Sequence, residues 1–177
     1  MVAVVVAVVL AMPLFKSAYN SITLPLAYAP VIRQEAAQKH LDPALIAAVI
    51  YAETKFNPRR SPAGAEGLMQ IEPGTAEFLA HRSGATTFRV SDLGTPEVNI
   101  AYGSYYLRYL LDEYGGSKTL ALAAYNGGEA NVNRWVARNG RSMTIDQIPF
   151  PETRAYVVKV EQAQRDYRQQ YSDQLGY

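Results

Sequence analysis

Cysteine is missing from this 177-residue sequence, which excludes a disulfide framework, a zinc site with cysteine ligands and thiol catalysis. An excess of charge of either sign is also missing, since 17 Lys and Arg stand against 16 Asp and Glu. Bulk charge therefore does not direct the protein to nucleic acid or to an acidic partner. Substrate binding must depend on a cleft, and no nucleic-acid partner is expected.

Metal-binding patterns are equally scarce. The two histidines, His40 and His81, are isolated from each other in the sequence, and no acid-rich calcium loop accompanies them. We therefore expect neither a metal site nor a cofactor. Strand signals are poor, and no internal repeat follows residue 26. Apolar residues nevertheless make up 49% of the chain, which is enough for the core of one domain.

The first residues form an apolar run, VAVVVAVVLAMPLF, at positions 2–15. It is shorter than the ~20 residues of a membrane span and is more typical of a signal-peptide core. No Lys or Arg precedes it, and Pro30 follows the nearest small-residue cleavage site. Extended to residue 29, the run becomes a borderline anchor, and a buried core helix is the remaining alternative. We expect residues 1–26 to be a signal peptide or membrane anchor of an exported protein.

The rest of the chain, residues 27–177, carries repeated helix signals. Asp42-Pro43 is a typical N-cap and first-turn pair, and Asn57-Pro58 ends that helix because the residue before proline avoids helical geometry. Pro73, Pro96 and Pro151 open further helices. The helices predicted in this way cover residues 29–41, 43–56, 73–83, 96–114, 118–128, 128–140 and 151–171. Asn126-Gly127 is the expected cap of the fifth, and residues 59–72 show no periodicity. The sequence predicts a mainly α single domain from about residue 27 to 172.

Glu53 lies in the last turn of the predicted helix over residues 43–56. Its neighbours three and four positions earlier, Ile50 and Val49, are apolar. Desolvation and the negative end of the helix dipole both disfavour a carboxylate, so the pKa of Glu53 should be raised. An acid that stays protonated near neutral pH can donate its proton to a leaving oxygen. From these residues alone, a surface Glu at a frayed helix end remains the alternative.

Four ordered stretches resemble the soluble lytic transglycosylases, lysozyme-like enzymes that cut bacterial peptidoglycan. They are ETKFNP with SPAGAEGLMQ (53–58 and 61–70), AYNGG (124–128), IPFPETRAYV (148–157) and, more weakly, NIAYGSYYL (99–107). The resemblance covers about residues 27 to 160. It implies a lysozyme-like fold of the goose-type lysozyme and SLT kind, in which a single helical domain carries a substrate cleft. It also implies a place in the bacterial cell envelope.

The same resemblance implies the reaction. The family cleaves the β-1,4 bond between N-acetylmuramic acid and N-acetylglucosamine without water. Glu53 is implied to protonate the glycosidic oxygen and then to accept the proton of the muramyl C6 hydroxyl, which closes a 1,6-anhydro ring. An attacking group in the same molecule can have an effective molarity of ~10⁵ M or more, so it outcompetes water. The substrate's acetamido carbonyl takes the place of the second carboxylate that ordinary glycosidases use.

Other matched positions have supporting roles by resemblance. Ser61 is implied to hydrogen-bond the sugar near its acetamido group, and Met69 and Gln70 to line the sites next to the scissile bond. The remaining implied substrate-binding residues orient the acetamido carbonyl or complete the cleft wall, and they are Tyr125, Asn126, Glu152 and Tyr156.

Three positions depart from the family pattern. Ser61 follows Glu53 by one position fewer than is common, so the intervening loop is tighter and the contact of Ser61 is less certain. Glu72 stands where Met is common, and Thr54 stands where Ser is usual. None of these changes removes the acid.

Two alternatives stay open. A hydrolytic lysozyme-type muramidase would need a second carboxylate to position water, and neither Glu66 nor Glu72 is required by the family pattern. A non-catalytic peptidoglycan-binding scaffold would gain nothing from a buried acid at Glu53. The expected partner is the peptidoglycan glycan strand, and contacts with envelope assembly or division proteins, or with the membrane through residues 2–26, are left open.

Overall fold

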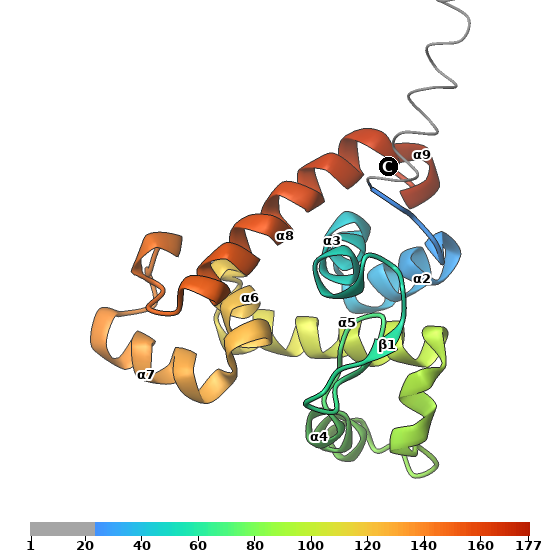
Figure 1. Ribbon diagram of the computed structural model, residues 1–177, viewed down its shortest axis with the longest axis horizontal. Helices are drawn as coiled ribbons and strands as arrows, with labels where there is room; N and C mark the ends of the chain where they lie inside the picture. Colours follow the sequence, from blue (N-terminus) through green and yellow to red (C-terminus); the bar gives the residue numbers. More distant parts are fainter. Residues whose placement is uncertain (1–23) are drawn as a thin grey trace, which may run out of the picture.

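The computed structural model describes residues 24–177, and helices dominate this part of the chain (Figure 1). The helices are α2 (Ala29–Lys39), α3 (Pro43–Thr54), α4 (Pro73–Ser83), α5 (Pro96–Glu113), α6 (Lys118–Gly127), α7 (Glu129–Asn139), α8 (Pro151–Gln170) and α9 (Ser172–Leu175). The remaining elements are the 3-10 turns η1 (Val90–Gly94) and η2 (Ile145–Gln147) and the strands β1 (Arg59–Arg60) and β2 (Glu66–Gly67). The prediction of a mainly α domain is confirmed.

The interpretation of residues 1–26 as a leader or anchor lies outside the described residues, apart from its last three positions. Within residues 24–177, no helix is both long enough and apolar enough to cross a membrane. The chain at Leu24 and Pro25 is held against α8, because the hydroxyls of Tyr171 and Tyr167 donate hydrogen bonds to the two backbone carbonyls.

Most helices begin where proline or a capping residue predicts. Pro43 opens α3, and the Asp42 carboxylate accepts the Ala44 N–H at 2.9 Å. The Ser117 hydroxyl accepts the Leu120 N–H at the start of α6. Thr95 occupies the N-cap position of α5 but its side chain makes no capping bond, so the start of this helix is marked by Pro96, as predicted.

Several helix ends differ from the prediction. Helix α2 stops at Lys39, before the predicted residue 41, because His40 has a left-handed φ of 51°. Helix α3 stops at Thr54 because Lys55 and Phe56 both take left-handed backbone angles, with φ of 52° and 62°. Helix α6 continues through Gly127 and ends on Gly128, whose φ is 82°. The predicted Asn126-Gly127 cap was therefore wrong. Beyond α8, the short helix α9 was not predicted.

Helix α3 is the centre of the core. Its residues 44–50 are all buried, as expected of a helix that is apolar on every side. It packs along α8, while α6 joins α8 to α5 and α2 lies against α5 (Figure 1). This arrangement brings the C-terminal end of α3 and the first half of α8 to the same place in the molecule.

The segment 59–72, which was predicted to be irregular, contains a small hairpin. Strands β1 and β2 pair antiparallel, with Arg59 opposite Gly67 and Arg60 opposite Glu66. Glu66 also forms an isolated bridge with Ile71. The hairpin lies between the end of α3 and α4 (Figure 1).

The close contact of this segment with α5 generates a test of the packing. A Cβ atom at Gly103 would lie 2.4 Å from the Met69 Sδ and 2.8 Å from its Cβ. Because Met69 is fully buried, we expect Gly103→Ala to lower the free energy of unfolding by about 1–3 kcal/mol. Urea denaturation followed by circular dichroism measures this change.

The matched control is Gly74→Ala in α4. A Cβ there meets nothing within 4 Å, so the substitution should raise the free energy of unfolding by roughly 0.4–1 kcal/mol by restricting the unfolded chain. Equal effects of the two substitutions would contradict the close contact between Gly103 and Met69.

Candidate active site

Glu53 lies in the last turn of α3 and faces α8. Its Oε1 accepts a hydrogen bond from the Tyr156 hydroxyl at 2.7 Å. Ile50 and Val49, the neighbours named from the sequence, are both fully buried. Two predicted site residues that are 103 positions apart in the chain are therefore in direct contact.

Burial raises the pKa of Glu53 from 4.5 to about 7, against the hydrogen bond from Tyr156 and the charges of Lys159 and Arg59, which lower it. The direction agrees with the sequence prediction. The helix dipole was also predicted to raise this pKa, but two cations at the end of α3 oppose its effect. The Arg59 guanidinium donates to the Glu53 carbonyl at 2.9 Å, and the Lys159 ammonium donates to the Ala52 carbonyl at 2.7 Å. Both cations neutralise the negative end of α3.

Tyr125 of α6 belongs to the same cluster. Its hydroxyl donates to the Met69 carbonyl at 2.9 Å. Burial, and then the negative charge of Glu53, raise the pKa of both Tyr125 and Tyr156 well above the ordinary value. Both hydroxyls therefore remain neutral hydrogen-bond donors beside the acid. The structure brings Glu53, Tyr125 and Tyr156 together.

Tyr125 is itself supported by tyrosines of α5. Its ring lies 5.2 Å from that of Tyr106, centroid to centroid. The hydroxyls of Tyr106 and Tyr109 donate to the two carboxylate oxygens of Glu129, at 3.3 and 3.0 Å. An acid on α7 therefore holds both of these tyrosines in place.

Met69 and Gln70 hold the chain beside the acid rather than presenting two open side chains. The Met69 side chain is fully buried. Gln70 has a left-handed φ of 50°, and its amide nitrogen donates to the carbonyls of Arg59 and Gly67, both at 2.8 Å. Gln70 thus ties β1 to β2, and both hydrogens of its amide group have carbonyl partners.

Asn99, at the start of α5, is a positioning residue that sequence reasoning missed. It is fully buried, and its Oδ1 accepts the Met69 N–H at 2.8 Å. Its amide nitrogen donates to the carbonyls of Glu66 at 2.9 Å and Leu93 at 3.1 Å. A Cβ at Gly67 would lie 2.2 Å from this nitrogen, so glycine leaves the space that the amide fills. A polar residue beside apolar helix positions was the available signal.

Thr54 ties the end of α3 to the same segment. Its hydroxyl donates to the Leu68 carbonyl at 2.7 Å, and it also lies 3.2 Å from the Ile50 carbonyl. Serine, which is usual here in the family that the sequence resembles, would supply the same hydroxyl. Ser61 lies in the hairpin turn, where its Oγ accepts the Ala65 N–H at 2.9 Å. Its contact with a sugar stays a prediction.

Asn126 and Glu152 meet in a depression of about 430 Å³ between α6 and the start of α8. Both side chains are exposed. Phe150 also lines this depression, is 43% exposed and packs edge-on against Trp135 with centroids 5.0 Å apart. An exposed aromatic ring beside an amide and a carboxylate suits a sugar, and sequence reasoning did not single out Phe150.

The cluster supports proton transfer by one carboxyl group. The side chains that shift the pKa of Glu53 are one tyrosine and two cations. No second carboxylate is among these side chains. Over residues 24–177, no three His, Asp or Glu side chains gather in a way that could hold a metal ion. The arrangement suits an acid that loses and regains a proton near neutral pH.

Comparison with known proteins gives one consistent result. The model of the transglycosylase SLT domain matches residues 30–148. The soluble lytic murein transglycosylase of Salmonella typhimurium is 35% identical over 142 residues, which are 77% of this chain and 22% of that protein. The chain thus spans about a fifth of the length of this curated relative.

Two solved structures agree with this match. The 70-kDa soluble lytic transglycosylase of Escherichia coli superposes with a TM-score of 0.79 and 33% identity over 84% of this chain and 25% of that one. The lytic transglycosylase Slt of Pseudomonas aeruginosa gives a TM-score of 0.78 and 32% identity over 86% of this chain and 26% of that one. The latter was solved as an inactive mutant in which glutamine replaces a glutamate.

The raised pKa of Glu53 predicts a pH-dependent change in stability. Unfolded Glu53 loses its proton near pH 4.5, whereas the folded protein keeps it to about pH 7. The folded protein therefore loses stability as pH rises across this interval. Each unit of difference between the folded and unfolded pKa corresponds to ~1.4 kcal/mol of stability. Above pH 7, Glu53→Gln should therefore be more stable than the wild type by up to ~3 kcal/mol.

Below pH 4.5 the two proteins should have nearly the same free energy of unfolding, because the side chain is uncharged in both. Chemical denaturation at pH 4 and pH 8 measures the difference. The control is Glu77→Gln, which alters an exposed side chain of α4 and should change stability little at either pH. If Glu53→Gln were less stable than the wild type at pH 8, burial would not be destabilising the carboxylate.

Proposed function

The chain belongs to the transglycosylase SLT domain family, and from this premise we propose that it is the catalytic domain of a peptidoglycan lytic transglycosylase. The observation that carries the proposal is Glu53, a half-buried acid with a pKa raised to about 7 and a hydrogen bond from Tyr156. The relatives described above are lytic transglycosylases, which supports the same reaction. The proposed substrate is the glycan strand of the bacterial cell envelope.

Bond cleavage begins with proton donation in this proposal. Protonated Glu53 gives its proton to the glycosidic oxygen between N-acetylmuramic acid and N-acetylglucosamine. A group with a pKa near the working pH is well matched to such a transfer. The bond from the carbon to the leaving oxygen breaks, and the substrate's own acetamido carbonyl stabilises the cationic carbon. No protein nucleophile is required.

The second step uses the carboxylate that the first step produced. Glu53 takes the proton of the muramyl C6 hydroxyl, whose oxygen attacks the anomeric carbon and closes the 1,6-anhydro ring. Tyr156, Lys159 and Arg59 stabilise the carboxylate during the interval between the two transfers, because each of them lowers its pKa. Glu53 ends the cycle protonated and ready for the next bond.

The surrounding residues are proposed to bind and orient the sugars. Tyr125 and Asn126 orient the acetamido carbonyl, with Tyr125 fixed through its bond to the Met69 carbonyl. Because the Met69 side chain is buried, Met69 acts through its backbone. Gln70 and Ser61 shape the neighbouring sites from the hairpin, and Glu152 completes the wall.

Product identity tests the proposal. Peptidoglycan is digested with the wild-type chain and with Glu53→Gln, and the fragments are analysed by mass spectrometry. We expect anhydro-ended muropeptides from the wild type and none from the variant, because the amide cannot donate or accept the proton. Glu152→Gln serves as the matched control and should retain the anhydro products at a lower rate.

Reducing-ended fragments would instead establish a hydrolytic muramidase and a group that positions water. Intact strands that sediment with both proteins would establish the non-catalytic binding scaffold. Either result would contradict the proposal that the protein is a lytic transglycosylase.

The pH dependence of activity tests the electrostatic role of Lys159. Activity should fall as pH rises through about 7, the pKa of Glu53, because the acid must be protonated. Lys159→Met removes a charge that lowers this pKa, so the alkaline limb of kcat/KM should move upward by about 0.5 pH unit. Methionine keeps the aliphatic contact with the Tyr51 ring, over which the ammonium lies 5.7 Å from the centroid.

Lys118→Met is the control for net charge. Lys118 contacts Gln164 and Glu161 on another part of α8 and does not act on Glu53. Its substitution should leave the alkaline limb in place. A downward shift in Lys159→Met, or equal shifts in both variants, would contradict the role of Lys159.

A further inference from the structure

The turn between α6 and α7 carries two of the residues that are proposed to orient the substrate. Tyr125 and Asn126 lie in the last turn of α6, and Gly128, with a left-handed φ of 82°, separates this helix from α7. Glu129 follows as the first residue of α7. Because Glu129 comes only a few positions after Tyr125 and Asn126, whatever fixes its side chain also restrains both of them.

Glu129 fastens this turn to α5. Its two carboxylate oxygens accept hydrogen bonds from the hydroxyls of Tyr106 at 3.3 Å and Tyr109 at 3.0 Å. The carboxylate lies in the first turn of α7, where the positive end of the helix dipole stabilises a negative charge. Burial, and then the charge of Glu129, raise the pKa of Tyr106 well above its ordinary value, so its hydroxyl stays a neutral donor.

Tyr106 transmits this restraint to Tyr125. The Tyr106 ring is buried, and its centroid lies 5.2 Å from that of Tyr125 and 6.2 Å from that of Tyr109. A tyrosine whose hydroxyl is bound cannot change rotamer without breaking that bond. Glu129 therefore limits where the Tyr106 ring can lie, and this ring limits the position of Tyr125.

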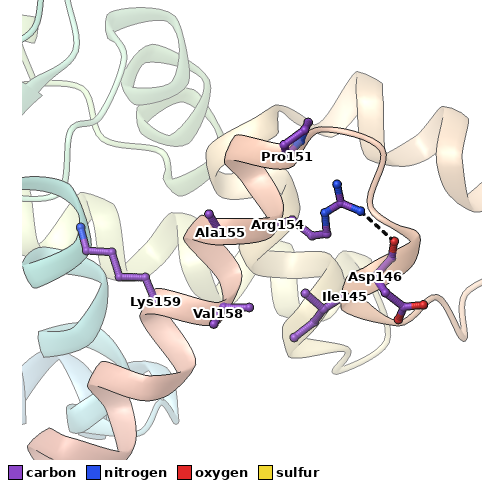
Figure 2. A pocket seen from close by; sticks show the side chains of 7 residues that line it. All are labelled: Ile145, Asp146, Pro151, Arg154, Ala155, Val158 and Lys159. Atoms are coloured by element: carbon purple, nitrogen blue, oxygen red, sulfur yellow. Dashed lines mark hydrogen bonds between the residues drawn. The ribbon is translucent and has the colours of Figure 1, made fainter.

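The same turn also contacts α8. A Cβ atom at Gly127 would lie 3.0 Å from the Thr153 Oγ1, and Thr153 is buried. The residue after it, Arg154, donates to the Asp146 carbonyl at 3.1 Å, and Figure 2 shows how this bond ties the first turn of α8 to η2. Because the α8 side is fixed in this way, the contact with α5 decides how the turn is oriented.

We propose that Glu129 is a positioning residue of the reaction. By holding the turn on α5, it orients Tyr125 and Asn126 toward the acetamido carbonyl of the reacting sugar. This assignment rests on the proposed function, in which that carbonyl stabilises the cationic carbon. Glu129 is not among the side chains that shift the pKa of Glu53, so it acts on geometry and leaves the proton affinity of the acid unchanged.

Such a role predicts a loss in kcat with little change in KM. The acetamido carbonyl stabilises charge only while the glycosidic bond breaks, so its orientation matters more in the transition state than in the bound substrate. A misplacement of about 1 Å can lower a rate by about 10²-fold. Without Glu129 the turn keeps its contact with α8, so the expected loss is smaller than this limit.

Two substitutions of Glu129 test the assignment, with the release of anhydro-ended muropeptides as the measured reaction. Glu129→Ala removes both acceptors, and we expect kcat to fall by about tenfold or more while KM stays within about twofold of the wild type. Glu129→Gln keeps one oxygen that accepts a hydroxyl and an amide group that donates to the other, so it should retain most of kcat. The alkaline limb should stay at about pH 7 in both variants, because the pKa of Glu53 is unchanged.

Two tyrosines of α5 provide a matched pair. Tyr106→Phe removes a hydroxyl that binds Glu129 and keeps the ring beside Tyr125, so kcat should fall by about threefold or more. Tyr114→Phe also removes a bond between α5 and α7, since the Tyr114 hydroxyl donates to the Asn133 Oδ1 at 3.0 Å. Asn133 lies about one helical turn beyond Glu129, so this substitution should lower stability without changing kcat. Thermal unfolding followed by circular dichroism compares the stability of all variants.

Three results would overturn the assignment. An unchanged kcat in Glu129→Ala, or a loss confined to KM, would mean that Glu129 does not orient the reacting sugar. Equal losses in Glu129→Ala and Glu129→Gln would mean that its charge acts rather than its hydrogen bonds. Equal losses of kcat in Tyr106→Phe and Tyr114→Phe would mean that the contact of α5 with α7 only supports the fold.

The tyrosine pair decides the question if Glu129→Ala does not fold, because both phenylalanine variants keep the carboxylate and both rings. Failure of the proposed function is distinguished from these results by the wild type. In that case the unaltered chain releases no anhydro-ended product, whereas failure of the assignment leaves wild-type cleavage intact.

Discussion

The hydrogen bond from Tyr156 to Glu53 is the contact on which the site depends. It joins the end of α3 to α8, and both helices must be packed for it to form. The same packing partly buries the carboxyl group, and this desolvation raises its pKa to about 7. Removing water favours the protonated form, while the hydroxyl favours the carboxylate. Together these two opposed effects leave the pKa of Glu53 near neutrality.

The segment 59–72, next to Glu53, has little regular structure of its own. Side chains from distant helices therefore hold this segment in place. Asn99, Thr54 and Tyr125 bind its backbone at Met69, Leu68 and Glu66. Buried backbone groups need such partners, and here the partners come from three helices. Glycine at position 67 admits the Asn99 amide. The same contacts that satisfy the loop also set its distance from Glu53.

Local signals in the sequence predicted most of the helices and the direction of the shift in the pKa of Glu53. Proline and Asp42 mark helix starts, and Val49 and Ile50 identify the buried turn around Glu53. The hairpin was not predicted, because its stability comes from contacts such as Tyr125 with Met69, 56 positions apart, which no local pattern records. Asn99 was missed although its place among apolar helix positions was a signal, because its partners Met69 and Glu66 lie 30 and 33 positions away. Asn126 and Glu152 were assigned to substrate binding only by resemblance to the family. Their contacts with sugar stay predictions.

Arg59 and Lys159 explain how an acid can lie at the negative end of a helix and still have a pKa near neutrality. With the dipole unopposed, burial and the free carbonyls of α3 would act together and keep Glu53 protonated at higher pH. A carboxyl group of that kind donates poorly and cannot serve as a base. The two cations bind these carbonyls, so the end of the helix no longer adds to the effect of burial.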